Sequence, residues 1–288
     1  MTERLADIGA RIDGIRQLGA VVNAMRGIAA ARAQQARSQL VAVEGYAATI
    51  ANAIGRALAL IPAFSPDGVR RSTRPALVLF CAEQGFAGAF SERVLDAVGG
   101  DLATSELFLI GTRGGAAIAE RGVTAGWQAA MPSHSPGIPK LADRVAEALY
   151  ARIAKSEIDR LEAVFSRWRP GHGIAVERRR LFPFDVAAFP RPAEADAPLL
   201  DLAPDALLRE LTAEYMHAQL CDAALHAFAA ENQARMEAMA STRHQIERQL
   251  AELRTTQRLV RQEEITAEII ELAAGETASR SSYGAAGR

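Results

Sequence analysis

The feature that most constrains the fold is the stretch of residues 205–274, which contains neither glycine nor proline. Such a stretch predicts one uninterrupted helix, which at about 1.5 Å per residue would be on the order of 100 Å long. Side chains recur along it at alternating steps of three and four, mostly apolar but with Arg243 and Gln257 among them: Met236, Met239, Arg243, Ile246, Leu250, Leu253, Gln257 and Val260. This is the heptad pattern of a coiled coil, whose apolar stripe needs a partner.

The first segment, residues 1–58, repeats the pattern near the opposite end of the chain. Its seam positions are Leu5, Ile8, Ile12, Ile15, Gly19, Val22, Arg26 and Ala29. We therefore predict that residues 5–50 and 206–274 form one antiparallel coiled coil. A glycine inside a helix costs about 1 kcal/mol relative to alanine, so the glycines of this segment are expected to mark close approaches of backbone. They are Gly9, Gly14, Gly19 and Gly27.

Between the two helices the periodicity changes to short apolar runs that alternate with helical segments. Strands are predicted at 76–82, 107–111, 163–168 and 174–182, and helices at 91–98 (with Ser91 as N-cap), 116–121 and 141–156. This alternation predicts a small, mostly parallel α/β domain of Rossmann-like type. The predicted fold class is therefore α/β, with a long antiparallel coiled coil of the N- and C-terminal helices and the α/β domain inserted between them. The expected divisions are 1–58, 75–183 and 205–275, and proline-rich linkers are expected at 62–75 and 183–204.

Composition and charge exclude several classes of protein. The net charge of −1 gives no reason to expect a nucleic-acid partner. No stretch reaches the roughly 18 apolar residues of a membrane span, and the N-terminal segment lacks the apolar core of a signal peptide. We therefore expect a cytoplasmic protein, or one peripheral to a membrane. Cys81 and Cys221 are expected to be buried, reduced thiols.

Few residues suggest chemistry carried out by this chain. The turn Gly85-Phe86-Ala87-Gly88 follows a strand and precedes a helix, where a phosphate loop would lie, but it does not match G-x-G-x-x-G. A tight turn is the expected interpretation, with nucleotide binding as the alternative. The histidines show no metal-ligand spacing, and no Ser/His/Asp arrangement stands out. We expect no catalytic residue, no cofactor and no metal site.

Four segments resemble the gamma subunit of F-type ATP synthases. Residues 22–32, VNAMRGIAAAR, are similar to a motif in that family's first helix, and residues 80–90, FCAEQGFAGAF, to its S-D-R-G-L-C-G-x-x-N turn. Residues 231–239, ENQARMEAM, are similar to its S-E-x-x-x-R-M-x-A-M, and residues 261–275, RQEEITAEIIELAAG, to its terminal R-Q-x-x-I-T-Q-E-L-x-E-I-V-x-G. The segments follow one another in the family's order.

Departures from the family pattern occur at places where gamma meets the catalytic ring. Asn23 stands where the family has Lys, Gly27 where it has a second Met, Ala267 where it has Gln, and Ile270 where Thr is frequent. A divergent gamma subunit, such as that of the sodium-type N-ATPases, fits this pattern.

The resemblance implies a non-catalytic central stalk. In the family, the coiled coil turns inside a hexamer of alpha and beta subunits, and the α/β domain packs with the epsilon subunit on the membrane-embedded c-ring, at the cytoplasmic face of the cell membrane. Ion flow turns the ring and gamma with it. The motif matches imply partner contacts at Met25, Arg26, Arg261, Gln262, Ala267 and Ile270.

Two other classes of function remain open from the sequence. One is an α/β nucleotide-binding enzyme that its helices dimerise, supported by the turn at Gly85–Gly88. The other is a coiled-coil scaffold without a motor. A bound nucleotide after purification would favour the first, and failure to co-purify with ATPase subunits would favour the second.

Overall fold

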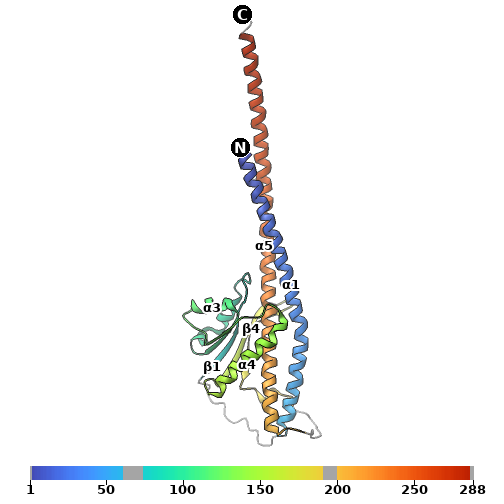
Figure 1. Ribbon diagram of the computed structural model, residues 1–288, viewed down its shortest axis with the longest axis vertical. Coiled ribbons are helices and arrows are strands. Elements are labelled where there is room, and N and C mark those ends of the chain that lie inside the picture. Colours follow the sequence, from blue (N-terminus) through green and yellow to red (C-terminus); the bar gives the residue numbers. More distant parts are fainter. Residues whose placement is uncertain (1, 61–73, 191–199, 286–288) are drawn as a thin grey trace. The chain divides into compact units, whose positions relative to one another are not determined.

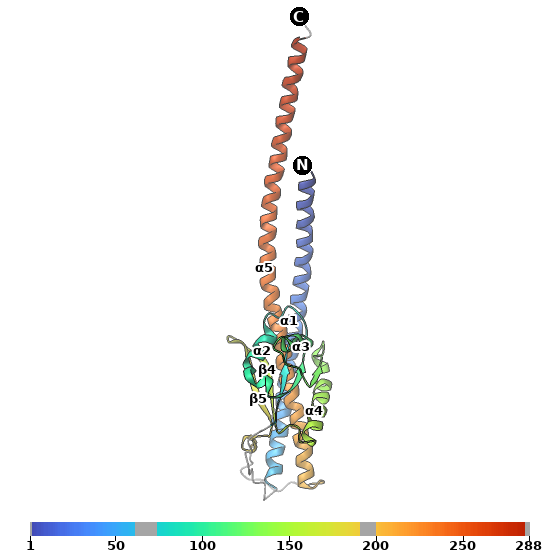
Figure 2. The ribbon, with the colours of Figure 1, turned by 90° about the vertical axis from the view of Figure 1, so that its left-hand side faces the viewer.

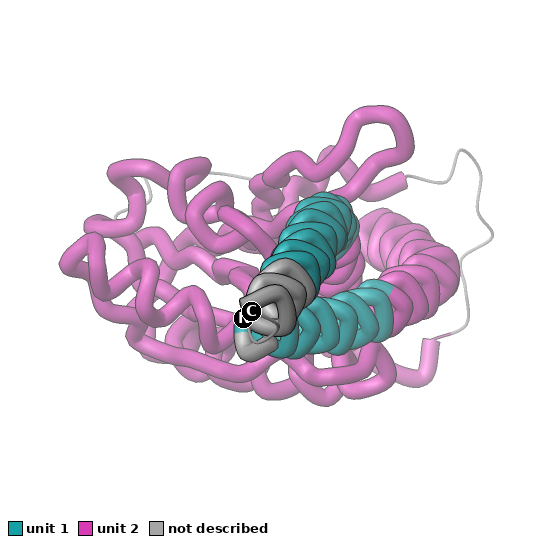
Figure 3. Tube along the Cα trace, turned by 90° about the horizontal axis from the view of Figure 1, so that it is seen from above, with its two compact units in different colours: residues 1–26, 239–288 teal, residues 27–238 magenta. Residues whose placement is uncertain are grey.

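The computed structural model describes residues 2–60, 74–190 and 200–285 (Figure 1). Two long helices, α1 (Thr2–Leu58) and α5 (Pro204–Ala285), precede and follow the strands of a five-stranded sheet in the chain. The chain divides into two compact units, residues 1–26 with 239–288 and residues 27–238, so that the boundary falls inside both long helices (Figure 3). Most of the predicted linker at 62–75 and part of the one at 183–204 lie outside the described residues, and the predicted three-part division stays a prediction.

In the first unit, α1 and α5 pack as the heptad seams predicted. Ile8 and Ile12 form a buried cluster with Val260, and Val22 forms another with Met239 and Ile246. Residue numbers rise along α1 as they fall along α5, which makes the pair antiparallel. The predicted α/β fold class is confirmed, and so is the antiparallel packing of the two helices as far as Val260. Residues 261–274 of the predicted coiled coil are exposed, apart from half-buried Glu264.

The glycines of α1 do not play the part that the sequence predicted. A methyl group added at Gly9, Gly14 or Gly27 would meet nothing within 4 Å, and at Gly19 it would only touch the Ile246 side chain at 3.4 Å. The expectation of close backbone approach was therefore wrong for these positions. It holds instead at Gly55, where an added methyl group would lie 1.8 Å from the carbonyl oxygen of Pro190.

The sheet of the second unit has the strand order β3-β2-β1-β4-β5. The strands are β1 (Pro75–Phe80), β2 (Glu106–Ile110), β3 (Trp127–Ala129), β4 (Arg160–Arg169) and β5 (Gly173–Phe182). All neighbours are parallel except β4 and β5, which form an antiparallel hairpin. The sequence did not predict β3, because three residues are too few to show a period.

Helices cover both faces of the sheet (Figure 2). They are α2 (Phe90–Val98), α3 (Thr112–Ala119) and α4 (Ile138–Ala154), with short 3₁₀ turns at Gly99–Ala103, Ser135–Gly137 and Val186–Ala188. One apolar cluster joins α2 and α3 to one face, and another joins α4, α1 and α5 to the other face. Among the described residues, no helix combines the length and hydropathy needed to cross a membrane.

The predicted N-cap at Ser91 was wrong. Ala89 precedes α2, and Ser91 lies inside the helix, where its hydroxyl accepts a hydrogen bond from the Ala82 N–H at 3.1 Å. The side chain therefore holds the end of β1 instead of the start of the helix. Both cysteines are buried, free thiols, as expected, and burial raises the pKa of each to about 12.

Two neighbouring glycines of α3 provide a test of this packing. An added methyl group at Gly114 would lie 2.6 Å from the Cβ of Cys81 and 2.9 Å from a methyl group of Leu109, whereas at Gly115 the nearest atom is 3.9 Å away. We expect Gly114→Ala to lower the free energy of unfolding by about 1–3 kcal/mol through overpacking. Gly115→Ala, the matched control, should leave it unchanged or raise it by up to about 1 kcal/mol. Urea titration measures both, and equal effects would contradict the packing described for α3.

Candidate functional site

The middle of α5 is buried on every side. Residues 220–235, about four turns, are all buried in the second unit, and many of them are alanines that let neighbouring elements come close. Six polar side chains lie in this stretch: Asp222, His226, Glu231, Asn232, Gln233 and Arg235. A buried polar group is costly unless it is hydrogen-bonded, so the partners of these six show what the helix is fixed to.

Glu231 and Arg235 fix α5 to the turn that follows β1. The Glu231 carboxylate accepts hydrogen bonds from the backbone N–H groups of Glu83 at 3.2 Å and Gln84 at 3.1 Å. Arg235 pairs with Glu231 and donates from Nε to the carbonyl oxygen of Gly85 at 3.1 Å. Glu231 and Arg235 belong to the motif at 231–239, and they therefore form contacts within this chain.

The turn lies where a doubly wound sheet would bind a ligand. The chain builds outward from β1 in both directions, so the ends of β1 and β4 flank the point where strand order reverses, the usual ligand crevice of such folds. Here Ala82, Ala87 and Phe90 pack on Ala230 and Ala234, with Trp168 at the end of β4 alongside. The α5 helix thus occupies the crevice.

A second carboxylate occupies the start of α3. Glu83 accepts hydrogen bonds from the N–H groups of Thr112 at 3.0 Å and Met131 at 2.9 Å, which follow β2 and β3. Helix starts and turn N–H groups are the donors that bind phosphates in nucleotide enzymes. In the described structure Glu83 and Glu231 use these donors, so the turn at Gly85–Gly88 is the tight turn that the sequence favoured. Positive φ angles at Phe86 (62°) and Gly88 (60°) give it its shape.

Burial raises the pKa of the Glu231 carboxyl, whereas Arg235 and the two backbone N–H groups act in the opposite direction. The side chains of Glu231 and Arg235 are only 4% and 6% exposed. Removing either side chain would therefore leave the charge of the other buried without its partner.

The predicted partner-contact residues all belong to the first unit and lie at two levels of it. Met25 packs partly buried against the cluster of Val22, Met239 and Ile246, and half-buried Arg26 donates to Asn23 at 3.4 Å. Met25 is thus part of the coiled-coil seam.

Arg261, Gln262, Ala267 and Ile270 lie farther along α5 and are all exposed. Arg261 follows Val260, which packs on Ile8 and Ile12, so it lies about 20 Å along the helix from Ile246. The structure therefore does not bring the two groups of predicted contact residues together.

Sequence reasoning missed an apolar surface on this end of α5. Ile265, Ile269 and Leu272, spaced four and three residues apart, form one exposed ridge, with exposed fractions of 50%, 61% and 75%. Leu259 and Ile270, also exposed, lie about a third of a turn away on a second ridge. The side of α5 that forms the seam, which continues from Val260 to Glu264 and Ala267, faces a third direction around the helix axis. A helix that is apolar in several directions is suited to burial among partners on more than one side.

Comparison with known proteins gives a consistent result. A sequence model of the family described as ATP synthase matches residues 4–278. The chain is 27% identical over 286 residues to the ATP synthase gamma chain of Chlorobium luteolum, covering 94% of this chain and 97% of that one. It is 28% identical over 294 residues to that of Frankia casuarinae, covering 96% and 98%.

Solved structures show the same fold. A chain of the rotor of the Euglena gracilis mitochondrial ATP synthase has a TM-score of 0.61 at 16% identity, with 92% of this chain and all of that chain covered. A chain from a second structure of that enzyme, which includes F1 and the c-ring, has a TM-score of 0.63 at 13% identity, covering 96% and 95%.

Removing Arg235 tests the anchoring of α5. We expect Arg235→Leu to lower the free energy of unfolding by about 3–5 kcal/mol near neutral pH, because Glu231 is left charged and buried without its partner. The folded-state pKa of Glu231 then lies further above its unfolded value. The loss should therefore be largest at neutral pH and shrink as pH falls toward the ordinary carboxyl pKa, where Glu231 takes up a proton.

Arg243→Leu is the matched control, since Arg243 forms a solvent-exposed pair with Glu247 at the same spacing, and such exposed pairs contribute little to stability. Urea titrations of both variants and the wild type between pH 5 and 8 measure the difference. Similar losses in the two variants, or a loss from Arg235→Leu that is independent of pH, would contradict the anchoring role.

Proposed function

Because the chain belongs to the ATP synthase family, as a gamma subunit of the central stalk, we propose that its two long helices serve as the shaft that couples rotation to the affinity of the nucleotide sites around it. Ion flow through a membrane-embedded c-ring would turn this shaft. The shaft in turn would force the catalytic sites through different affinities, so that ATP is made or hydrolysed there.

The observation that carries this proposal is the end of α5. Its two apolar ridges, at Ile265, Ile269 and Leu272 and at Leu259 and Ile270, are exposed in the chain alone. Burial of such side chains contributes about 25 cal/mol per Å² of apolar surface removed from water. A ring of subunits around the helix would cover both ridges at once, which a single flat partner surface could not do.

The proposed partners are the alpha and beta subunits around the end of α5, together with an epsilon subunit and the c-ring. The relatives that this chain matches over nearly their whole length carry the name ATP synthase gamma chain, and the similar solved structures are titled as rotor and central stalk. We place the protein at the cytoplasmic face of the cell inner (plasma) membrane, peripheral to it through the c-ring. Co-purification with alpha and beta subunits from membranes tests this assignment, and isolation without them would contradict it.

We propose that the chain itself catalyses no reaction. The support is the crevice at the strand-order reversal, where α5 packs and where Glu231 and Glu83 use the N–H groups that a phosphate would need. The backbone N–H groups of the turn are thus already bonded to the carboxylate of Glu231 on α5. ATP turnover by the purified chain that is lost on changing Gly88 would contradict this.

The first test of the proposed function is Ile269→Asp. A charge on this ridge should weaken assembly with alpha and beta subunits by about 2 kcal/mol or more, because it would be buried without a partner. The melting temperature of the isolated chain should not change, since Ile269 is 61% exposed. Glu268→Gln, in the same exposed turn, is the control. Co-elution on gel filtration measures assembly, and unimpaired assembly by Ile269→Asp would count against the shaft.

We further propose that Arg261 and Gln262, with Ala267 and Ile270, contact the catalytic ring, and that Met25 and Arg26 support the shaft at another level. The motif match at 261–275 and the exposure of these α5 side chains support this. Removing an arginine that pairs with a partner carboxylate away from water costs far more than removing a solvated one, which contributes only about 0.2–1 kcal/mol.

Arg261→Ala should therefore cost about 2–5 kcal/mol of coupling, because a partner carboxylate is left unpaired. Arg254→Ala, at another exposed position of the same helix, is the matched control and should have little effect. Ala267→Gln should strengthen coupling by restoring a hydrogen-bonding side chain. Ion-driven ATP synthesis in vesicles is the measurement, and normal synthesis by Arg261→Ala would rule out its role as a coupling residue.

A further inference from the structure

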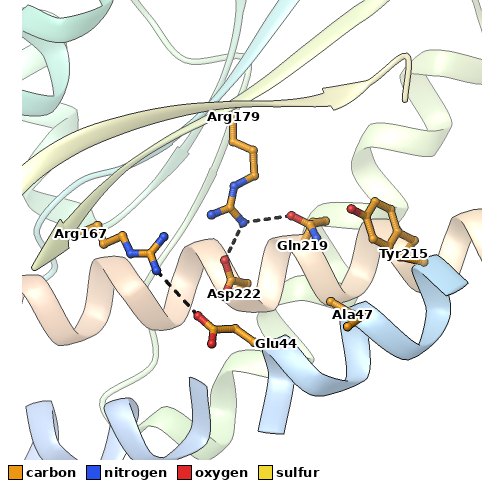
Figure 4. A pocket seen from close by; sticks show the side chains of 9 residues that line it. Glu44, Ala47, Arg167, Arg179, Tyr215, Gln219 and Asp222 are labelled. Atoms are coloured by element: carbon orange, nitrogen blue, oxygen red, sulfur yellow. Dashed lines mark hydrogen bonds and ion pairs between the residues drawn. The ribbon is translucent and has the colours of Figure 1, made fainter. Parts of the chain in front are cut away.

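A cavity of about 340 Å³ opens in the second unit between α1, the β4–β5 hairpin and α5 (Figure 4). The charged residues of its wall are Glu44 on α1, Asp222 on α5, and Arg167 and Arg179 on the hairpin. Arg179 donates to Asp222 Oδ2 at 2.5 Å and to Gln219 at 2.9 Å, and Arg167 lies 3.8 Å from Glu44 Oε1.

Beside this cavity, His226 is buried with an unused nitrogen. Its ring stacks on Phe165, with centroids 6.0 Å apart and planes 13° apart, and its side chain is 7% exposed. Its Nε2 lies 3.6 Å from Asp222 Oδ1 and 3.8 Å from Glu44 Oε1. These distances are too long for hydrogen bonds, and both Nε2 and Oδ1 are buried atoms without a hydrogen-bond partner in the described structure. An orphaned donor–acceptor pair of this kind calls for an occupant between them.

The atoms that face this gap favour a cation as the occupant. They are the ring nitrogen of His226 and one carboxylate oxygen each from Asp222 and Glu44. Glu177 is paired with Arg167, Arg169 and Arg179. Burial lowers the pKa of His226, with Asp222 acting in the opposite direction and Arg167 and Arg179 adding to the lowering. A neutral imidazole is the form that binds metal ions.

We propose that Glu44, Asp222 and His226 form a binding site for a divalent transition-metal cation, for which zinc is the best fit. Zinc bonds to nitrogen and carboxylate oxygen are about 2.0–2.2 Å long, which places tetrahedral ligand atoms about 3.3–3.6 Å apart. The observed distances of 3.6 and 3.8 Å need only a small inward shift, and the three ligand atoms all lie within 4.8 Å of one another. Water from the cavity completes the coordination.

The surroundings fit such a site. Arg179 holds the outer oxygen of Asp222, as outer hydrogen-bond partners hold metal ligands elsewhere. The bound ion would join α1 to α5, and because it binds only the folded arrangement it would stabilise the packing of the two helices. The spacing of histidines and cysteines in the sequence gave no indication of this metal site. The signal it did contain is the i, i+4 pair of Asp222 and His226, completed by a glutamate far away in the chain.

Zinc binding to the purified full-length chain, stripped with chelator, tests the proposal. Calorimetric titration should show one equivalent bound, with a raised melting temperature. His226→Gln should abolish the binding, and Glu44→Gln should weaken it at least tenfold. Since Glu44 is half exposed, its variant keeps the test valid if His226→Gln fails to fold.

His217→Gln is the matched control, because His217 lies on the same helix, near Cys221 and Asp143, and could attract zinc by itself. This variant should bind as the wild type does, and cobalt bound in place of zinc should show no thiolate absorption. Absence of binding would overturn the proposal. So would binding that survives in His226→Gln, binding that is lost in His217→Gln, or a melting temperature that follows pH but not zinc.

Discussion

The burial of residues 220–235 of α5 on every side is the constraint on which the α/β unit depends. A helix enclosed in this way can carry polar side chains only where each meets a partner. Arg179 meets Asp222, the turn after β1 meets Glu231 and Arg235, and Arg37 on α1 donates to Gln233 at 2.7 Å. Arg37 also lies 4.0 Å over the ring of Trp168. These contacts join α1 and α5 to the turn after β1 and to the β4–β5 hairpin, so none of these elements can shift alone. His226 is the member of the set whose Nε2 has no such partner, which is why it suggests an occupant.

The same contacts explain how a fold that commonly binds nucleotides can instead hold a helix of the central stalk. The strand order places a crevice beside the ends of β1 and β4, and in this chain a helix packs there. The carboxylates of Glu231 and Glu83 accept from the N–H groups that would otherwise face a phosphate. Anion recognition by turns and helix starts is thus retained, but the anions are the chain's own side chains. The sheet therefore holds the middle of the long helix in place of a ligand.

Much of the fold could be predicted because it depends on local patterns. The absence of glycine and proline over 205–274 and the two seams are visible in the sequence, and Val22, Met239 and Ile246 lie buried in the seam as the spacing requires. The candidate site could be predicted less well from the sequence. The ridge of Ile265, Ile269 and Leu272 is apolar, but sequence alone does not show that α1 leaves it uncovered. Ser91 has the character of an N-cap, yet the end of β1 offered its hydroxyl a buried backbone donor, and that bond was formed.

The sequence by itself determined the periods: two long helices with matching seams, and between them a βα alternation that closes into a mostly parallel sheet. These periods can be read from the sequence because apolar side chains three and four residues apart lie on one face of a helix, and those two residues apart lie on one face of a strand. Only the tertiary structure decided which polar groups meet. Glu231 reaches the turn 147 residues before it, and Glu44 comes beside His226, because the sheet and both long helices share one core. Contacts between such distant residues depend on the packing of whole elements, which no local spacing records.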